Sequence, residues 1–262
     1  MTADQVLDAT LAYRGHFGLN VDPRLNPNEF DAAIDEANPR FKGERRHISV
    51  VRFQLEGDTT EFTAEDKKVI MRTAGALDML APETPLAGDF DIIAGLGAAR
   101  MANYDRLKYA AEALRSSGAT GQLIAAGGKR KLVPGEIDAA EYYAHGDEET
   151  EEDLQRSAAQ KIGEEYDLDV PVITIDNPKA HNALILDGIV AAFPRARHLA
   201  GVTTQIYQVR TGLDFDRQGR LYGLTTSVAG NPSDPLVAAK RTPVTYQSEI
   251  AGAQKAAAKY FL

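Results

Sequence analysis

Gly95, Gly97 and Arg100 stand in one short segment, GLGAAR, whose composition is typical of a loop that holds an anion. Glycines let backbone N–H groups approach a negative group closely, above all where a helix begins, and the arginine adds a positive charge. The third glycine of a dinucleotide fingerprint is missing, because Arg100 stands in its place. We therefore expect an anion site here, not a standard NAD site, and a tight turn without a ligand is the alternative.

A second glycine pair, Gly127 and Gly128, precedes three cations that begin at Lys129. Glycines followed by positive charge suit phosphate, sulfate or carboxylate groups. The segment is not a P-loop, because it lacks the upstream glycine and the Ser/Thr after the lysine. We expect these three residues to contact an anion, and a solvated basic loop is the alternative.

Hydroxyl groups and a cation follow one another in the segment TTQIYQVR. Thr203 and Thr204 can offer hydroxyls, and Tyr207 and Arg210, three residues apart, would share one face of a helix. An arginine in the first helical turn is poorly placed for the helix dipole, and a bound anion would relieve that cost. We expect all four residues at the ligand, with a salt bridge of Arg210 to a neighbouring acid as the alternative.

The proton carriers that we expect are Glu151 and His181, each near the start of a predicted helix. The positive end of the helix dipole favours an ionised Glu151 and a neutral His181. Asn182 follows directly and is expected to contact the ligand. A structural role at the helix start is the alternative for His181. The five histidines show no metal-ligand spacing, so we predict no metal site.

Alternating strands and helices must position these residues. Short apolar runs at 90–94, 122–126, 170–175 and 199–203 predict buried strands, and the helices expected between and after them begin near residues 103, 150, 180 and 205. This alternation is typical of a parallel sheet covered on both faces. We predict a Rossmann-like three-layer αβα fold with a mainly parallel sheet, whose ligands bind beyond the carboxyl ends of the strands.

The chain before this region has a mainly helical pattern, with one expected strand at 47–55. Thr63 and Asp66 have the spacing of a helix-capping box. The proline-containing segment 81–85 predicts a linker. We therefore expect a mostly helical N-terminal extension, residues 1–85, and a sheet domain, residues 86–262, whose C-terminal helix (246–260) packs back on the sheet domain.

The composition of the 262-residue chain narrows the function classes. Apolar residues make up 44%, enough for a real core, and the net charge of −9 argues against a nucleic-acid binder. The chain has no cysteine, which excludes disulfides and thiolate sites. The sequence shows no targeting segment and no apolar run of membrane-spanning length. We expect a cytoplasmic protein without membrane insertion.

The order of these motifs resembles the DUF218 family, the ElyC/SanA/YdcF group. The resemblance spans about Asp89 to Ser227, and it is carried by Gly95, Gly97, Arg106, Gly127-Gly128, Thr150-Glu151-Glu152, Asn182, Thr203-Thr204 and Arg210. Two departures are Tyr207, where the family usually has histidine, and Ala180-His181, which replaces the usual Thr-x-Glu. A charged insertion also lengthens the second loop. The resemblance implies a Rossmann-like fold, cell-envelope roles and nucleotide-like ligands.

These patterns favour a protein that binds a small anionic, nucleotide-like ligand at the carboxyl edge of the sheet. The alternative is a hydrolase or transferase that acts on a phosphate- or nucleotide-containing substrate, with Glu151 or His181 as acid or base. A second alternative is a noncatalytic interaction protein whose N-terminal region docks a partner. The sequence identifies no cofactor.

Overall fold

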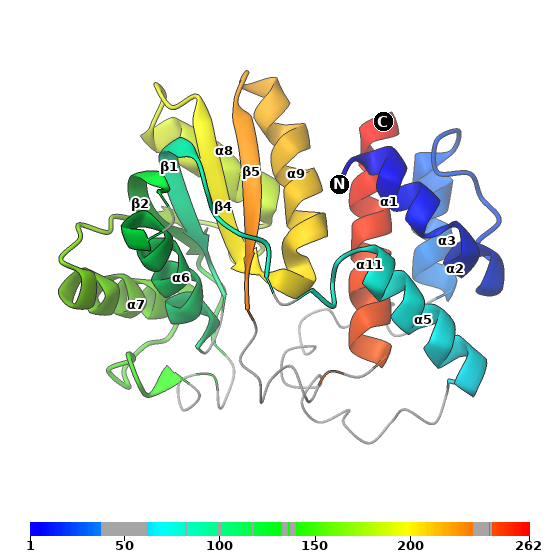
Figure 1. Ribbon diagram of the computed structural model, residues 1–262, viewed down its shortest axis with the longest axis horizontal. Coiled ribbons are helices and arrows are strands. Elements are labelled where there is room, and N and C mark those ends of the chain that lie inside the picture. The colour runs from blue at the N-terminus through cyan, green and yellow to red at the C-terminus, as the bar shows by residue number, and fades with distance from the viewer. Residues whose placement is uncertain are drawn as a thin grey trace. The chain divides into compact units, whose positions relative to one another are not determined.

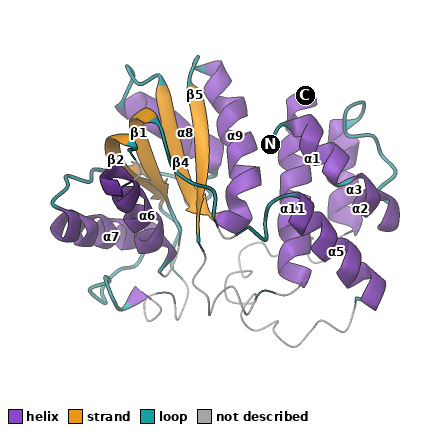
Figure 2. Cartoon of the chain, viewed as in Figure 1, coloured by secondary structure: helices purple, strands orange, loops and turns teal. Residues whose placement is uncertain are grey.

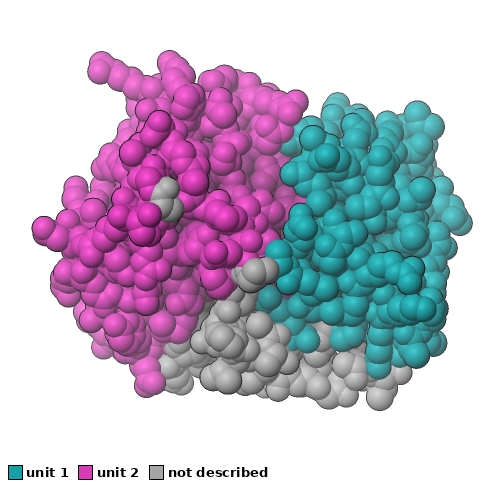
Figure 3. Space-filling view, viewed as in Figure 1, with its two compact units in different colours: residues 1–81, 233–262 teal, residues 82–232 magenta. Residues whose placement is uncertain are grey.

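The computed structural model describes residues 1–37, 62–81, 83–98, 101–116, 118–132, 136, 140–232, 241 and 243–262. Arg100 and the strand expected over 47–55 lie outside these residues. The chain forms two compact units (Figure 3): unit 1 comprises Met1–Ala81 and Ser233–Leu262, and unit 2 comprises Pro82–Pro232.

Unit 2 contains a five-stranded sheet in its described residues, and every strand pair is parallel (Figure 1). The strands are β1 (Asp89–Leu96), β2 (Thr120–Gly128), β3 (Val172–Ile175), β4 (His198–Thr204) and β5 (Thr225–Asn231), in the spatial order β3-β2-β1-β4-β5. The four predicted strands are confirmed. The edge strand β5 was not predicted, because its sequence, TTSVAGN, lacks an apolar run.

Helices cover both faces of this sheet (Figure 2), which confirms the predicted three-layer, Rossmann-like fold. The helices are α6 (Ala102–Ser116), α7 (Glu151–Tyr166), α8 (Asn182–Ala192) and α9 (Gln208–Leu221), the last preceded by the 3₁₀ turn η4 (Gln205–Tyr207). Ile93 of β1 belongs to a core cluster with Leu107 of α6 and Leu154 of α7. Its neighbour Ile92 faces the opposite way, into a cluster with Phe215 of α9, as the alternation of a strand requires.

Close packing on this sheet depends on Gly95. A Cβ at that position would lie 2.4 Å from Leu107 Cδ2, so only glycine lets α6 approach β1 this closely. Helix α7 begins at the predicted residue, because the Thr150 hydroxyl accepts from the Asp153 N–H and the Asp153 carboxylate accepts from the Thr150 N–H. Helices α6 and α7 carry polar side chains to the ends of the strands.

Unit 1 is helical in its described residues. Its helices are α1 (Ala3–Ala9), α2 (Leu11–His16), α3 (Pro27–Ala37), α5 (Ala64–Ala76) and α11 (Pro243–Ala258), followed by the 3₁₀ turn η5 (Lys259–Phe261). The predicted capping box at Thr63 is confirmed. In the described part of the chain, no helix is long and apolar enough to cross a membrane.

The C-terminal helix does not join the sheet domain as we expected. Helix α11 belongs to unit 1, where it packs against α1, α3 and α5. Small buried side chains such as Ala253 and Ala257 let the neighbouring helices approach it closely. The units therefore differ from the expected division at residue 85, because unit 1 combines both ends of the chain.

Candidate functional site

The predicted loops meet at one edge of the sheet. In the parallel register, Gly95 of β1 lies beside Ala125 of β2 and Val202 of β4, and Gly128 lies beside Ile175, the last residue of β3. All four strands therefore end on the same side, as expected. The chain crosses from β1 to β2 on one side and later places β4 on the other, so β1 and β4 flank the topological switch point where ligands of such sheets bind.

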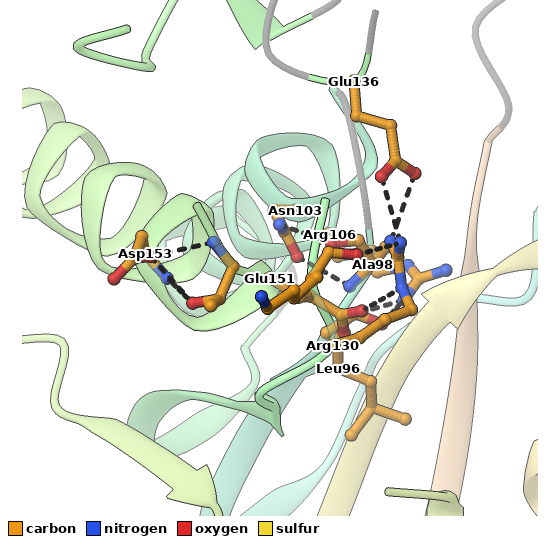
Figure 4. A network of polar contacts seen from close by, with 11 residues as sticks. Leu96, Ala98, Asn103, Arg106, Arg130, Glu136, Glu151 and Asp153 are labelled. Carbon is orange, nitrogen blue, oxygen red and sulfur yellow. Dashed lines mark hydrogen bonds and ion pairs between the residues drawn. The ribbon is translucent and has the colours of Figure 1, made fainter. Parts of the chain in front are cut away.

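Arg106 is the central charged group at this edge (Figure 4). Its side chain comes from α6 and is buried, with 5% exposure. Nη1 donates to the carbonyl oxygens of Leu96 (2.6 Å) and Gly97 (2.8 Å), and Nε and Nη2 both lie 3.3 Å from Thr204 Oγ1. The guanidinium thus joins the end of β1 to the end of β4. In the described part of the chain, all of its acceptors are uncharged oxygens.

The pKa of Arg106 reflects this environment. Burial lowers the pKa to about 10, which still leaves the guanidinium charged at neutral pH. Nearby Tyr207, Glu151 and Asp105 oppose the decrease, whereas the positive charge of Arg210 adds to it. Arg106 therefore carries a buried positive charge that no carboxylate in the described residues contacts directly.

The loop after β1 is fixed by Asn103, at the start of α6. Asn103 Oδ1 accepts from the Ala98 N–H (2.8 Å), and Nδ2 donates to the Ala98 carbonyl (2.6 Å). The Gly97 N–H donates to the Ala126 carbonyl at 2.7 Å. We expected backbone N–H groups of this glycine loop to point at an anion, but those of Gly97 and Ala98 are already bonded within the protein.

Gly97 and Gly127 serve another purpose, which is to make room for side chains of α7. A Cβ on Gly97 would lie 2.5 Å from Glu151 Oε1 and 3.3 Å from Gln155 Nε2. A Cβ on Gly127 would lie 2.5 Å from Gln155 Oε1. Gly128 is equally confined, since its Cβ would lie 2.6 Å from the Cβ of Ala180. The glycines bring α7 and the β3–α8 loop onto the strand ends.

Glu151 is held by a partly buried ion-pair network (Figure 4). Arg130 Nε donates to Glu151 Oε2 at 3.2 Å, and the two terminal nitrogens of Arg130 donate to the carboxylate of Glu136 at 3.0 and 3.1 Å. Burial raises the pKa of Glu151, although Arg130 and Arg106 oppose the increase. That the helix dipole keeps this carboxylate ionised stays a prediction, which the ion pair with Arg130 supports and burial opposes.

The segment after β4 lies at the same edge. Thr203 and Thr204 are buried, and Thr204 Oγ1 accepts from Arg106 as described. Tyr207 stands just before α9 and Arg210 in its first turn. The guanidinium carbon of Arg210 lies 5.6 Å from the centre of the Tyr207 ring, as expected for residues on one helix face. Thr204, Tyr207 and two arginines therefore lie near one another beside the end of β4, whereas the alternation of the strand directs Thr203 to the opposite face of the sheet.

Three predicted site residues lie away from Arg106, namely Lys129, His181 and Asn182. Lys129 Nζ forms ion pairs with Asp176 (3.3 Å) and Glu152 (3.8 Å), so its charge is partly offset by acids, where we expected an anionic ligand or a solvated basic loop. His181 is exposed at the start of α8, and its side chain makes no cap hydrogen bond. Asn182 Nδ2 donates to Asp214 Oδ2 of α9 at 2.9 Å. Their contacts do not connect them to Arg106.

Four residues of this arrangement were not predicted as site residues, namely Asn103, Arg130, Glu136 and Gln155. Arg106 entered only through the family resemblance. Asn103 and Arg106 lie three residues apart at the start of α6, and Gln155 lies one turn after Glu151 on α7. A signal existed at Gln155 and Arg106, because each interrupts an otherwise apolar helix face beside a glycine loop. Glu136, which is fully buried, lies in a charged segment that gives no such signal.

In the described residues, no cluster of histidine, aspartate and glutamate could hold a metal ion. No protein-family model, curated protein or solved structure matches the chain.

Proposed function

We propose that residues 82–232 bind a small anionic, nucleotide-like ligand at the edge where β1 and β4 end. The observation that carries the proposal is Arg106, a buried cation whose acceptors in the described residues are all uncharged. Buried charges in proteins are ordinarily paired. An anion at this edge would supply the missing negative charge.

Further cationic side chains lie near Arg106. Arg130 and Arg210 add two positive charges, and the carboxylates of Glu136, Glu151 and Asp105 lie nearby as well. Three arginines therefore gather at this edge in a chain whose net charge is −9. Hydroxyl groups can donate to oxyanions, and Thr204 and Tyr207 bring two of them to this edge.

The position within the fold supports a nucleotide-like ligand. The strand order β3-β2-β1-β4-β5 places the switch point between β1 and β4, the usual ligand position of doubly wound sheets. This part of the argument rests on analogy between folds. The motif order that resembles the DUF218 family points to the same edge, and membership in that family is part of our proposal.

A thermal-shift screen of the full chain tests the proposal. We expect nucleoside phosphates or inorganic phosphate to raise the melting temperature, and we expect the shift to shrink as salt concentration rises, because salt screens partly exposed charges. Matching neutral nucleosides should have much smaller effects. A screen in which only neutral or cationic compounds stabilise the protein would reject the proposal.

Acid–base catalysis on a phosphate- or nucleotide-containing substrate is the second candidate, and the burial of Glu151 favours it. A carboxyl whose pKa is raised can carry a proton nearer to neutral pH. Turnover that Glu151→Gln abolishes and His181→Ala leaves intact would establish this enzyme. Ligand that is bound and recovered unchanged would establish a binding protein instead.

A further inference from the structure

Gln155 is a buried polar side chain that the described residues do not satisfy. It is 2% exposed, and its Oε1 has no hydrogen-bond partner in the described part of the chain. A buried carbonyl oxygen without a partner costs about 1–3 kcal/mol. Such groups are rare in native proteins and often mark functional sites.

The position of Gln155 connects it to the candidate site. It lies one helical turn after Glu151, with its amide against Gly97 and Gly127 at the ends of β1 and β2. Arg106 binds the carbonyl oxygen of the same Gly97. The terminal torsion of a glutamine side chain is soft, so the amide can turn toward a ligand without movement of the backbone.

We propose that Gln155 is a specificity-determining residue that accepts a hydrogen bond from an O–H group of the bound anion. The inference rests on the proposed anion site and narrows its ligand to an anion that offers an O–H group, such as hydrogen phosphate or a phosphate ester with a neighbouring sugar hydroxyl. At neutral pH inorganic phosphate keeps an O–H group, whereas sulfate has the same shape and none. A site that presents an unpaired acceptor discriminates against the analogue that lacks the donor.

Calorimetric titration of the full chain with inorganic phosphate and with sulfate, at matched ionic strength and near-neutral pH, tests this inference. We expect the wild type to bind phosphate about tenfold or more tightly than sulfate, a ratio that one hydrogen bond supplies. Gln155→Met should bring the two affinities together by weakening phosphate. Methionine has similar length and helix propensity but offers no comparable acceptor.

Gln160→Met is the matched control on the same helix. Gln160 is exposed, and its Nε2 donates to Glu164 Oε1 at 3.0 Å, so this variant should keep the wild-type preference. Thermal unfolding without added anion gives a second readout. Gln155→Met should melt at a higher temperature than the wild type, because it removes the unpaired buried oxygen, whereas loss of a structural contact would lower the melting temperature.

Equal affinities of the wild type for phosphate and sulfate would overturn the inference and leave the anion site standing. A preserved phosphate preference in Gln155→Met would do the same, and a lower melting temperature with that preference would assign Gln155 a structural role. If the wild type binds neither anion nor any nucleoside phosphate, both the inference and the proposed function are wrong.

Discussion

Glu151 occupies the space beside Gly97 that any side chain at position 97 would need, since a Cβ there would lie 2.5 Å from Glu151 Oε1. The carboxylate cannot withdraw freely, because Arg130 holds its other oxygen and the backbone N–H of Glu151 donates to the Arg130 carbonyl at 2.8 Å. The glycine loop after β1 and the start of α7 are therefore held against each other. The carboxylate, the loop and the buried guanidinium of Arg106 are positioned together.

Gly97→Ala should consequently disturb both stability and ligand binding. The added methyl group would displace Glu151 or push α7 from the strand ends, and overpacking of this kind costs about 1–3 kcal/mol. Urea unfolding measures the stability, and titration with phosphate measures the binding. Gly15→Ala is the control, because a Cβ at Gly15 meets nothing within 4 Å. If Gly97→Ala matches the wild type in both measurements, the tight contact with Glu151 is not maintained in solution.

Arg210 and Lys129 were both predicted to contact the anion, but their surroundings now separate them. Arg210 stacks on Tyr207 and lies near Arg106, at the edge where β1 and β4 end, whereas Lys129 contacts Asp176 and Glu152 beyond β2 and β3. Arg210→Ala should weaken ligand binding by about 1.5–3 kcal/mol, as for a charge-assisted hydrogen bond. Lys129→Ala should change it by less than about 0.5 kcal/mol, as for an exposed ion pair. Calorimetric titration of both variants with phosphate measures the two losses of affinity. A larger loss in Lys129→Ala than in Arg210→Ala would place the anion beside Lys129.

Glu148 should make the stability of the fold depend on pH. Burial raises the pKa of this carboxyl, but hydrogen bonds from the His145 and Gly146 N–H groups and the Ser157 hydroxyl bring the pKa below its ordinary value of 4.5. A carboxyl with a lowered folded-state pKa stabilises the protein above its unfolded pKa and loses that contribution as pH falls through the folded value.

Glu148→Gln should therefore cost about 1–2 kcal/mol at neutral pH, and the difference from the wild type should shrink as the pH falls through the lowered pKa of Glu148. Denaturant unfolding at several pH values measures it. Glu149→Gln, an exposed neighbour, serves as the control. A pH-independent difference between Glu148→Gln and the wild type would mean that shape, and not charge, accounts for the role of Glu148.

Gln254, in unit 1, resembles Gln155 in having buried amide atoms without partners in the described residues. It is fully buried on α11, and neither Oε1 nor Nε2 has a hydrogen-bond partner there. Gln254→Met should raise the free energy of unfolding by about 1 kcal/mol or more, because unpaired buried polar atoms are costly. Thermal and urea unfolding measure the change, with Gln160→Met as the exposed control. A destabilised Gln254→Met would show that the amide is satisfied in solution.

The sequence was informative where buried parallel strands are continuous apolar runs. Strands β1, β2 and β4 are of this kind, and their carboxyl ends could be placed at one edge before the structure was known. Strand β5 is polar at the sheet edge, so apolar patterning could not reveal it. Helix α11 is rich in alanine, which predicts a buried helix without indicating which unit buries it.

The site was only partly predictable for a related reason. Glycines and exposed cations are visible as motifs, and Gly97 and Arg210 were found in this way. The contacts that define the site are long-range, such as Arg106 to Thr204, which are 98 residues apart. Gln155 interrupts an apolar helix face in the sequence, but its unpaired oxygen and its position beside the strand ends emerge only from the structure.

The most direct test of the anion site at Arg106 is calorimetric titration with adenosine monophosphate and with adenosine, using the wild type, Arg106→Lys and Arg197→Lys. Lysine keeps the charge but loses the forked donor geometry that joins β1 to β4. Arg197, whose Nη1 donates to the carbonyls of Pro194 and Ala196 near the opposite strand ends, is the control. We predict that the wild type and Arg197→Lys bind the nucleotide at least about tenfold more tightly than the nucleoside, and that Arg106→Lys loses most of this difference. Equal binding of nucleotide and nucleoside by the wild type, or an undiminished difference in folded Arg106→Lys, would contradict the account.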